Sequence, residues 1–199
     1  DLRQGFYQMQ WLEVGSWFCF DFPMAIRDFG LDSVYDEVNR AYVQVDPDTI
    51  VYPCFQGLAM GWSWSLHICN GITEDITRIG IGHALSISPD DVRIVSERAP
   101  CGRLAPGELA GSSYVDNSNV IGSPLSLVNA ALEAILREFE RRGLSYHEVC
   151  HATQDFVCCG VRFDFIAGRA VPQRERAWRL HRAMAALLDR GGCTPSAME

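Results

Sequence analysis

A tight hairpin around Tyr114 to Asn117 is the sequence feature that most constrains the fold. Two short β-prone segments, Ser113 to Val115 and Asn119 to Ile121, flank residues that tolerate a positive φ. This pattern predicts two antiparallel strands joined by a short turn. Such a turn would place the Asp116 carboxylate at the tip of the hairpin, where it can reach a metal ion. A turn that only reverses the chain would show the same pattern.

A second carboxylate stands at the start of the chain. Asp1 opens a stretch through Phe20 that is rich in aromatic and β-branched residues, and we expect it to begin a strand that breaks at Gly15. Aspartates on two neighbouring strand ends suit a pair of divalent cations that carry a phosphoryl transfer. Asp1 and Asp116 are therefore candidates for one metal site.

Four stretches, taken in order, make the chain resemble the palm of a reverse transcriptase. They are Asp1 to Gln8, similar to the first palm motif; Leu58 to Ser65, similar to the Leu-Pro-Gln-Gly-type motif; Tyr114 to Asn117, similar to the Tyr-x-Asp-Asp box; and Arg141 to Tyr146 with Phe156 to Val161, similar to the helix and hairpin that end the palm. Their order and rough spacing match over about residues 1 to 165. The elements resemble those of eukaryotic retroelement enzymes more than those of viral RNA replicases.

The resemblance implies an α+β fold, a polymerase palm in which an antiparallel sheet has helices packed on one face. The palm would span residues 1–165, with a surface insertion at about 88–112. Residues 166–199 would form a helical extension that begins the thumb. Because the chain opens on Asp and a motif begins at once, we expect the fingers to be missing upstream.

The activity that the resemblance implies is RNA-directed DNA polymerase, a nucleotidyltransferase that extends a primer 3′-hydroxyl. Asp1 and Asp116 would be the catalytic residues. With the backbone carbonyl of Leu2 they would hold two Mg²⁺ ions, for which Mn²⁺ could substitute. The partners would be an RNA or DNA template with its primer, deoxynucleoside triphosphates, and further domains of the same retrotransposon polyprotein, such as RNase H or integrase.

The family's other site residues map onto four regions of the chain. Those that would contact the substrate are Phe6, Met60, Gly61, Tyr114 and Asn117, and those that would grip the primer are Cys159, Gly160 and Val161. A Phe6 ring beneath the sugar would clash with a 2′-hydroxyl and favour deoxynucleotides. An ordinary core phenylalanine is the alternative at that position.

Three departures from the family pattern point to a divergent copy. Asn117 replaces the second Asp of the box, Ala59 and Met60 stand where Pro and Gln are usual, and no lysine follows Leu144. We expect this fragment to be inactive alone. Two alternatives remain: a degenerate polymerase-derived domain that binds nucleic acid or serves a structural role without catalysis, and an unrelated acidic α+β domain.

The charge balance is unfavourable for a nucleic-acid enzyme. The net charge is −8, and all 17 basic residues are arginine. Phosphate binding depends on such cations, and they gather between Phe156 and Arg190, where seven arginines face three acidic residues. Acidic residues around a metal site repel less once cations bind.

Composition and the cysteine pattern favour an intracellular protein, in the cytoplasm or nucleus. No apolar run approaches the ~20 residues that a membrane span needs. The eight cysteines contain no Cys-x-x-Cys pair, so we expect reduced thiols that are mostly buried.

Three helices are predicted from apolar spacing and end signals. The first runs from about Ser63 or Ser65 toward Ile79. The second spans 124–142, with Ser123 as cap and Gly143 as stop. The third spans Arg174 to Arg190.

Between residues 22 and 55 the signals are weaker. Pro23 can begin a helix and Gly30 can end one. The Asp46-Pro47-Asp48 stretch predicts a turn, and Thr49 to Phe55 predicts an edge strand.

Overall fold

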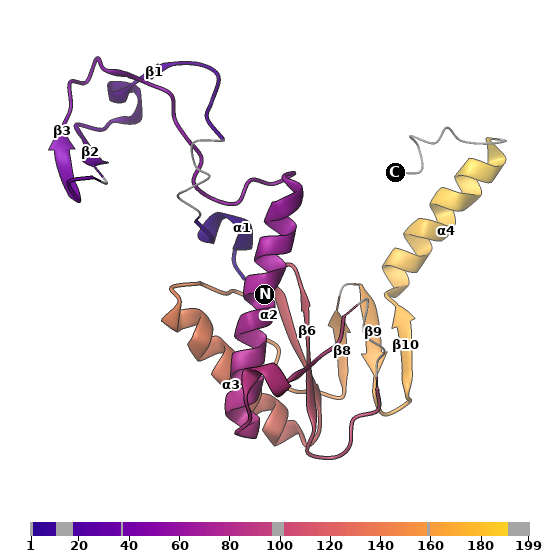
Figure 1. Ribbon diagram of the computed structural model, residues 1–199. Coiled ribbons are helices and arrows are strands. Elements are labelled where there is room, and N and C mark those ends of the chain that lie inside the picture. Colours follow the sequence, from indigo (N-terminus) through magenta and orange to yellow (C-terminus); the bar gives the residue numbers. More distant parts are fainter. Residues whose placement is uncertain (1, 11–17, 37, 97–101, 159, 191–199) are drawn as a thin grey trace. The chain divides into compact units, whose positions relative to one another are not determined.

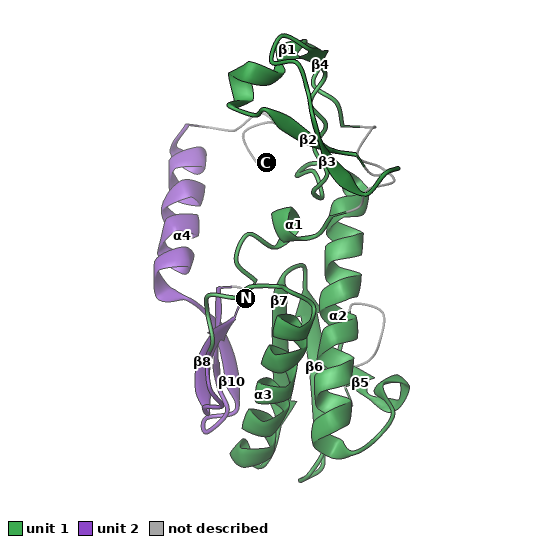
Figure 2. Ribbon diagram, turned by 90° about the vertical axis from the view of Figure 1, so that its left-hand side faces the viewer, with its two compact units in different colours: residues 1–149 green, residues 150–199 purple. Residues whose placement is uncertain are grey.

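The computed structural model describes residues 2–10, 18–36, 38–96, 102–158 and 160–190, and it has a mixed α+β fold (Figure 1). Contacts divide the chain into two compact units, Asp1–Val149 and Cys150–Glu199, coloured separately in Figure 2. This division differs from the boundary at residue 165 that the family resemblance implies, and that domain assignment stays a prediction.

The first part of unit 1 consists of short elements joined by turns. They are α1 (Gly5–Gln8), β1 (Met24–Ala25), the 3₁₀ helix η2 (Ile26–Phe29), β2 (Ser33–Asp36), β3 (Ala41–Gln44) and β4 (Ile50–Val51). The strands pair antiparallel, β1 with β4 and β2 with β3. Gly30 ends η2 with φ +67°, as predicted, whereas the predicted strand from Thr49 to Phe55 is only two residues long.

The predicted strand leaving Asp1 is wrong over the residues that the structure describes. Gly5–Gln8 form a helical turn, and Leu2 makes only an isolated antiparallel bridge to Tyr146. The Phe and Tyr of this segment favour strands in isolation, but contacts with distant segments determine its conformation.

The rest of unit 1 is a three-stranded sheet with two helices. Its elements are α2 (Ser63–Leu85), the 3₁₀ helix η3 (Pro89–Asp91), β5 (Arg93–Ile94), β6 (Leu109–Tyr114), β7 (Asn117–Gly122) and α3 (Leu125–Arg141). The strand order is β5-β6-β7. Helix α2 contacts β6, β7 and α3, and α3 contacts β7, so both helices cover one face of the sheet (Figures 1 and 2). That part of the prediction is confirmed.

Two details of the predicted sheet are corrected. It is not wholly antiparallel, because β5 pairs parallel with β6. The stretch 88–112 is also more than a surface excursion, since Val92, Leu109 and Ala110 are buried. Proline and glycine interrupt this stretch, but its apolar residues pack into the core beneath α2.

The helix ends follow the sequence signals in part. Helix α2 continues to Leu85, six residues beyond the predicted end, and stops at Ser86 in a left-handed conformation. Helix α3 matches its prediction to within one residue at each end, and Gly143 follows it with φ +71°. Ser123 does not cap it, because the cap position is Pro124 and has no side-chain hydrogen bond.

Two glycines allow α2 to sit close to its neighbours. A Cβ atom at Gly80 would lie 2.8 Å from the backbone nitrogen of Ile135 in α3. One at Gly111 in β6 would lie 2.7 Å from Cγ2 of Thr77 and 2.7 Å from Cδ1 of Ile94. Side chains here would separate the layers, so these positions need glycine for packing.

Substituting Gly80 should therefore weaken the fold. We expect Gly80→Ala to lower the free energy of unfolding by about 1–3 kcal/mol, because α3 backbone atoms must move to admit the methyl group. Gly71→Ala, in the same helix but facing open space, should raise it by up to about 1 kcal/mol through helix propensity. Urea denaturation of both variants measures the difference. Equal effects would show that the close contact is unimportant.

A charged cluster joins the middle of α2 to the C-terminal end of α3. The Glu138 carboxylate is buried and accepts hydrogen bonds from Arg141 (2.6 and 2.7 Å) and Arg142 (2.8 Å). Arg142 also donates to Asp75 of α2 at 2.7 Å. The bonds from Arg141 lower the pKa of Glu138 to about 2, against the opposing effect of burial.

This depressed pKa predicts a defined pH dependence. The stabilisation from ionised Glu138 is complete above its unfolded pKa, near 4.5, and is lost as the pH falls toward 2. Glu138→Gln should cost about 1–3 kcal/mol at pH 7 and much less near pH 2. Denaturation from pH 7 to 2 measures this, with the exposed Glu133→Gln as the matched control. If Glu138→Gln lowered the free energy of unfolding by the same amount at every pH, the depressed pKa of Glu138 would be contradicted.

Unit 2 is a sheet followed by a helix. It contains β8 (Asp155–Cys158), β9 (Val161–Asp164), β10 (Arg169–Pro172) and α4 (Arg174–Asp189), with strand order β10-β9-β8 and antiparallel pairing. The rings of Phe156, Phe163 and Phe165 stack with centroids 5.2–6.4 Å apart. The predicted final hairpin and third helix are confirmed. Among the described residues, no helix is both long and apolar enough to cross a membrane.

Candidate active site

The hairpin predicted around Asp116 is present, with longer strands than expected. Val115 and Asp116 alone separate β6 from β7, and Tyr114 pairs with Asn117. The left-handed residue is Val115, with φ +56°, whereas Asn117 does not have a positive φ. A β-branched residue in this region is strained.

A contact from α2 holds the strained turn. The backbone N–H of Val115 donates to Oδ1 of Asn70 at 3.0 Å. A further hydroxyl contact ties the hairpin to α2, since Oγ1 of Thr77 lies 2.6 Å from Oγ of Ser118. Both bonds stabilise the hairpin in this geometry and so offset part of its strain.

The Asp116 carboxylate is half-buried at the tip. Its Oδ1 accepts a hydrogen bond of 3.3 Å from Nδ2 of Asn117. No arginine or histidine of the described ranges forms an ion pair with it. The negative charge of Asp116 also affects Cys69 in α2. Burial raises the pKa of the Cys69 thiol to about 11, and the charge of Asp116 adds to that rise. The carboxylate is therefore available to a cation.

Helix α1 approaches this carboxylate closely. A Cβ atom at Gly5 would lie 2.8 Å from Cβ and 3.4 Å from Oδ2 of Asp116. The backbone N–H of Leu2 donates to the carbonyl of Asp116 at 3.1 Å. The segment that follows Asp1 thus lies directly on the hairpin tip. Asp1 itself lies outside the described residues. The structure therefore gives no distance between the Asp1 and Asp116 carboxylates, the two predicted catalytic groups.

The described residues alone do not make a complete metal site. No group of three or more His, Cys, Asp or Glu side chains that could hold a metal occurs among them. Asp116 and the backbone of Leu2 are the two predicted metal ligands that the structure places. They supply hard oxygen donors, which Mg²⁺ prefers.

The second predicted motif packs against α1. The backbone N–H of Leu58 donates to the carbonyls of Phe6 (3.1 Å) and Met9 (3.2 Å). The Tyr7 hydroxyl donates to the sulfur of Met60 at 3.1 Å. Gly61 follows with φ +90°, a conformation that glycine adopts without strain. Segments 2–9, 58–61 and 114–117 therefore form one cluster.

A polar clamp that the sequence does not predict holds α1. The Gln8 Oε1 accepts from the N–H (2.6 Å) and hydroxyl (2.8 Å) of Ser145, and Gln8 Nε2 donates to the carbonyls of Ser145 and Arg3. The N–H of Arg3 donates to the same Ser145 carbonyl at 3.0 Å. Ser145 is 137 residues from Gln8, so no local signal could reveal the pair.

The remaining predicted site residues fall into three groups. Tyr114 and Met60 are largely exposed, at 62% and 67%, whereas Phe6 and Asn117 are half-buried. Gly160, with φ +79°, and Val161 lie in the β8–β9 hairpin of unit 2. Cys159 lies outside the described residues.

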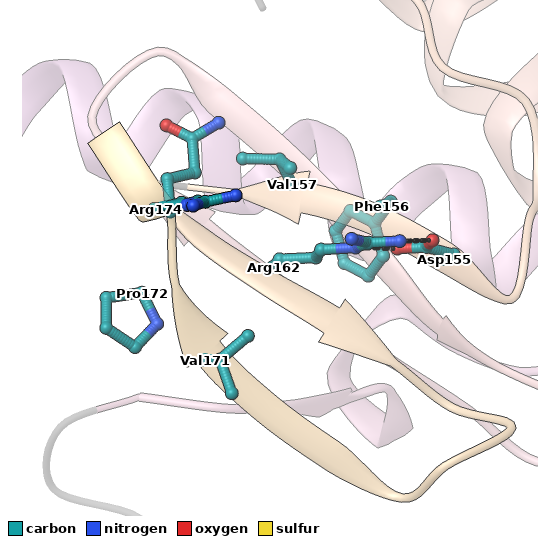
Figure 3. Close-up of a pocket in the computed structure, with 8 residues that line it drawn as sticks. Asp155, Phe156, Val157, Arg162, Val171, Pro172 and Arg174 are labelled. Carbon is teal, nitrogen blue, oxygen red and sulfur yellow. Dashed lines mark hydrogen bonds and ion pairs between the residues drawn. The ribbon is translucent and has the colours of Figure 1, made fainter. Parts of the chain in front are cut away.

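Unit 2 has a hollow of its own, of about 490 Å³ (Figure 3). Its lining residues are Asp155, Phe156, Val157, Arg162, Val171, Pro172, Gln173 and Arg174. Figure 3 shows the Arg162 guanidinium lying against Asp155, to which it donates two hydrogen bonds, one of 2.8 Å. That pair offsets the charge of Arg162, and Arg174 adds one further positive charge to the lining.

The clamp between Gln8 and Ser145 gives a testable prediction for the α1 segment. Gln8→Ala removes the bonds to Ser145, so the amides of Leu2 and Arg3 should exchange their hydrogens about 5- to 30-fold faster. Hydrogen exchange with mass spectrometry measures this, and Gln10→Ala, on an exposed residue of the same segment, is the matched control. Unchanged exchange in Gln8→Ala would mean that the clamp does not hold α1 in place.

Comparison with known proteins adds no family assignment. No protein-family model matches the chain, and no curated protein or solved structure is significantly similar to it. Inference about function therefore depends on the four motifs and on the contacts around Asp116.

Proposed function

We propose that the chain is the palm of a reverse transcriptase, an RNA-directed DNA polymerase of a eukaryotic retroelement. One observation carries the proposal: the N–H of Leu2 is bonded to the carbonyl of Asp116 at 3.1 Å. The two motifs that would supply the catalytic aspartates are far apart in sequence, yet their backbones are in direct contact.

The packing of the other motifs supports the same reading. In a palm, the first motif, the template-side turn and the Tyr-x-Asp-Asp hairpin face one substrate. Here α1 contacts the hairpin through Gly5 and the template-side turn through Tyr7 and Met60. Exposed Tyr114 and Met60 would be able to contact a base or sugar.

The proposed metal site would use Asp1, Asp116 and the Leu2 carbonyl. Two bound Mg²⁺ ions would activate the primer hydroxyl and neutralise charge on the triphosphate. Asp116 fits this role because it is a half-buried carboxylate that no described cation pairs with. The α2–β6 packing would hold it in place and so orient the reacting groups.

The substrate would be a primed template and deoxynucleoside triphosphates. Phe6 would lie beneath the sugar, with Met60, Gly61, Tyr114 and Asn117 around the nucleotide. Cys159, Gly160 and Val161 would grip the primer, and the arginines of α4 would bind its phosphates as the start of a thumb. The whole enzyme would act inside the cell, in the cytoplasm or nucleus, within a longer polyprotein.

A degenerate domain without catalysis is the second candidate, and one contact favours it. Asn117 stands where the family has a second Asp, and its amide donates to Asp116 at 3.3 Å. That bond occupies a carboxylate lone pair that a metal would use. Such a domain would bind nucleic acid or scaffold the polyprotein.

Substitutions at Asp116 and Asn117 separate these functions. In an extended protein that includes the polymerase fingers, Asp116→Asn should abolish Mg²⁺-dependent primer extension, because only one anionic ligand would remain. Asn117→Asp should raise extension several-fold at limiting Mg²⁺, since an added carboxylate strengthens the field that holds the cations. Extension rates over a Mg²⁺ titration measure both effects.

The control is the same change on an exposed carboxylate, Asp91→Asn. It should leave extension unchanged. Mn²⁺ binding to the present chain, followed by electron paramagnetic resonance, gives a readout without catalysis and should weaken in Asp116→Asn. Full activity of Asp116→Asn would remove the catalytic assignment, and inactivity of every variant together with normal nucleic-acid binding would favour the degenerate domain.

A further inference from the structure

We propose that Cys19 and Cys54 form a reversible disulfide that clamps the base of the arm, defined as residues 18–55. This modification site does not depend on the polymerase proposal. It differs from the expectation of reduced thiols that are mostly buried, which is wrong for the described free cysteines because only Cys69 of the five is buried.

The backbone geometry around the two cysteines suits a cross-strand disulfide. Cys19 and Cys54 face each other in an isolated antiparallel bridge. The flanking bonds run from the N–H of Phe20 to the Pro53 carbonyl and from the N–H of Phe55 to the Phe18 carbonyl, each 2.9 Å. Cys19 and Cys54 are therefore a non-hydrogen-bonded pair, in which opposed Cα atoms lie about 4.5 Å apart. Disulfides span that separation.

The side chains already point toward each other. The two sulfur atoms are 2.9 Å apart, so a modest rotation of each side chain brings them to bonding distance. Both residues are exposed, which lets a small oxidant reach them. Cys69, by contrast, is fully buried and out of reach of such a reagent.

The arm has little else to hold it together. Among its described residues, only Ala25 and Ile26 are buried apolar side chains. Its exposed large apolar side chains are Phe20, Phe22, Phe29, Leu31, Tyr35, Val38, Tyr42, Val43, Ile50 and Tyr52. Its strands form only two-stranded sheets, which are marginally stable alone. A segment with so small a core gains most from a cross-link that closes it.

The Cys19–Cys54 pair is also next to the candidate active site. Phe18, beside Cys19, packs edge-on against Trp62 with ring centroids 5.2 Å apart. Phe55, beside Cys54, packs against Tyr7 of α1 at 5.8 Å. Trp62 precedes α2 and Tyr7 bonds Met60. Closing the disulfide would therefore fix the base of the arm against both elements.

The oxidant we propose is a low-molecular-weight disulfide such as oxidised glutathione. The thiolate of one cysteine attacks it, forming a mixed disulfide and releasing one glutathione. The second cysteine then attacks the protein-bound sulfur, forms the Cys19–Cys54 bond and releases the other glutathione. Two protein thiols are oxidised, one glutathione disulfide is reduced to two thiols, and the two cysteine protons pass to these products.

Peptide mapping of the full chain tests the bond. The protein is equilibrated in glutathione buffers of increasing oxidation, its remaining thiols are alkylated, and it is digested with trypsin and chymotrypsin. Chymotrypsin is needed because Cys54 and Cys69 share one tryptic peptide. The Cys19–Cys54 peptide should be the main linked species and should disappear with dithiothreitol.

Hydrogen exchange of residues 20–53 tests whether the disulfide holds the arm closed. In the oxidised protein, amides that exchange through opening of the arm should slow about a hundredfold, from the loop-closure effect of a cross-link over this span. Dithiothreitol should restore the original rate. Cys54→Ser should abolish the slowing, and Cys150→Ser, on an exposed cysteine outside the arm, should keep it.

Three outcomes would overturn the proposal: linkage of Cys19 or Cys54 mainly to other cysteines, a stable mixed disulfide with glutathione at either position, or equal exchange in the oxidised and reduced protein. If Cys54→Ser does not fold, the comparison of the unsubstituted protein with and without dithiothreitol decides the question alone.

Discussion

The close contact of α2 with the layers beside it is the constraint on which the candidate site depends. Glycine at 80 and 111 lets the helix lie against α3 and β6 at distances that a side chain would prevent. At this depth Thr77 reaches the hydroxyl of Ser118 and Asn70 reaches the N–H of Val115. A helix displaced outward by one methyl group would lose both bonds, and with them the support of the turn that carries the candidate catalytic residue.

That turn stores strain at its first residue. Val115 has a positive φ, which for a β-branched residue costs on the order of 1–3 kcal/mol. The N–H of Val115 donates to Oδ1 of Asn70, and the N–H of Leu2 donates to the neighbouring Asp116 carbonyl; these two bonds hold the turn in place. Strain of this kind is found where the direction of a side chain matters. Here the strained turn places Cβ and Oδ2 of Asp116 beside Gly5.

The sequence predicts elements that carry their own end signals and misses those shaped by distant partners. Helix α3 could be predicted to within a residue because an apolar stripe lies between Pro124 and Gly143. The Asp116 hairpin likewise follows from its local pattern. Helix α1 could not be predicted, because its conformation depends on Ser145 and on the Leu58 segment, both more than 48 residues away. The same limit hid the Gln8 clamp and the parallel strand β5.

The charge at position 117 affects both the affinity of the proposed metal site and the stability of the turn. The acidic excess of the chain lies before Phe156, so nucleic acid would approach Asp116 against repulsion unless cations are bound. A second Asp beside Asp116 would add a like charge in a half-buried turn and destabilise the metal-free state. The Asn117 amide instead donates to Asp116 and stabilises the lone carboxylate. Asn rather than Asp at position 117 thus favours a turn that is stable without metal, and it would weaken the hold on a proposed cation pair because one negative charge is missing. Stability of the empty turn and affinity for cations are opposed at this one position.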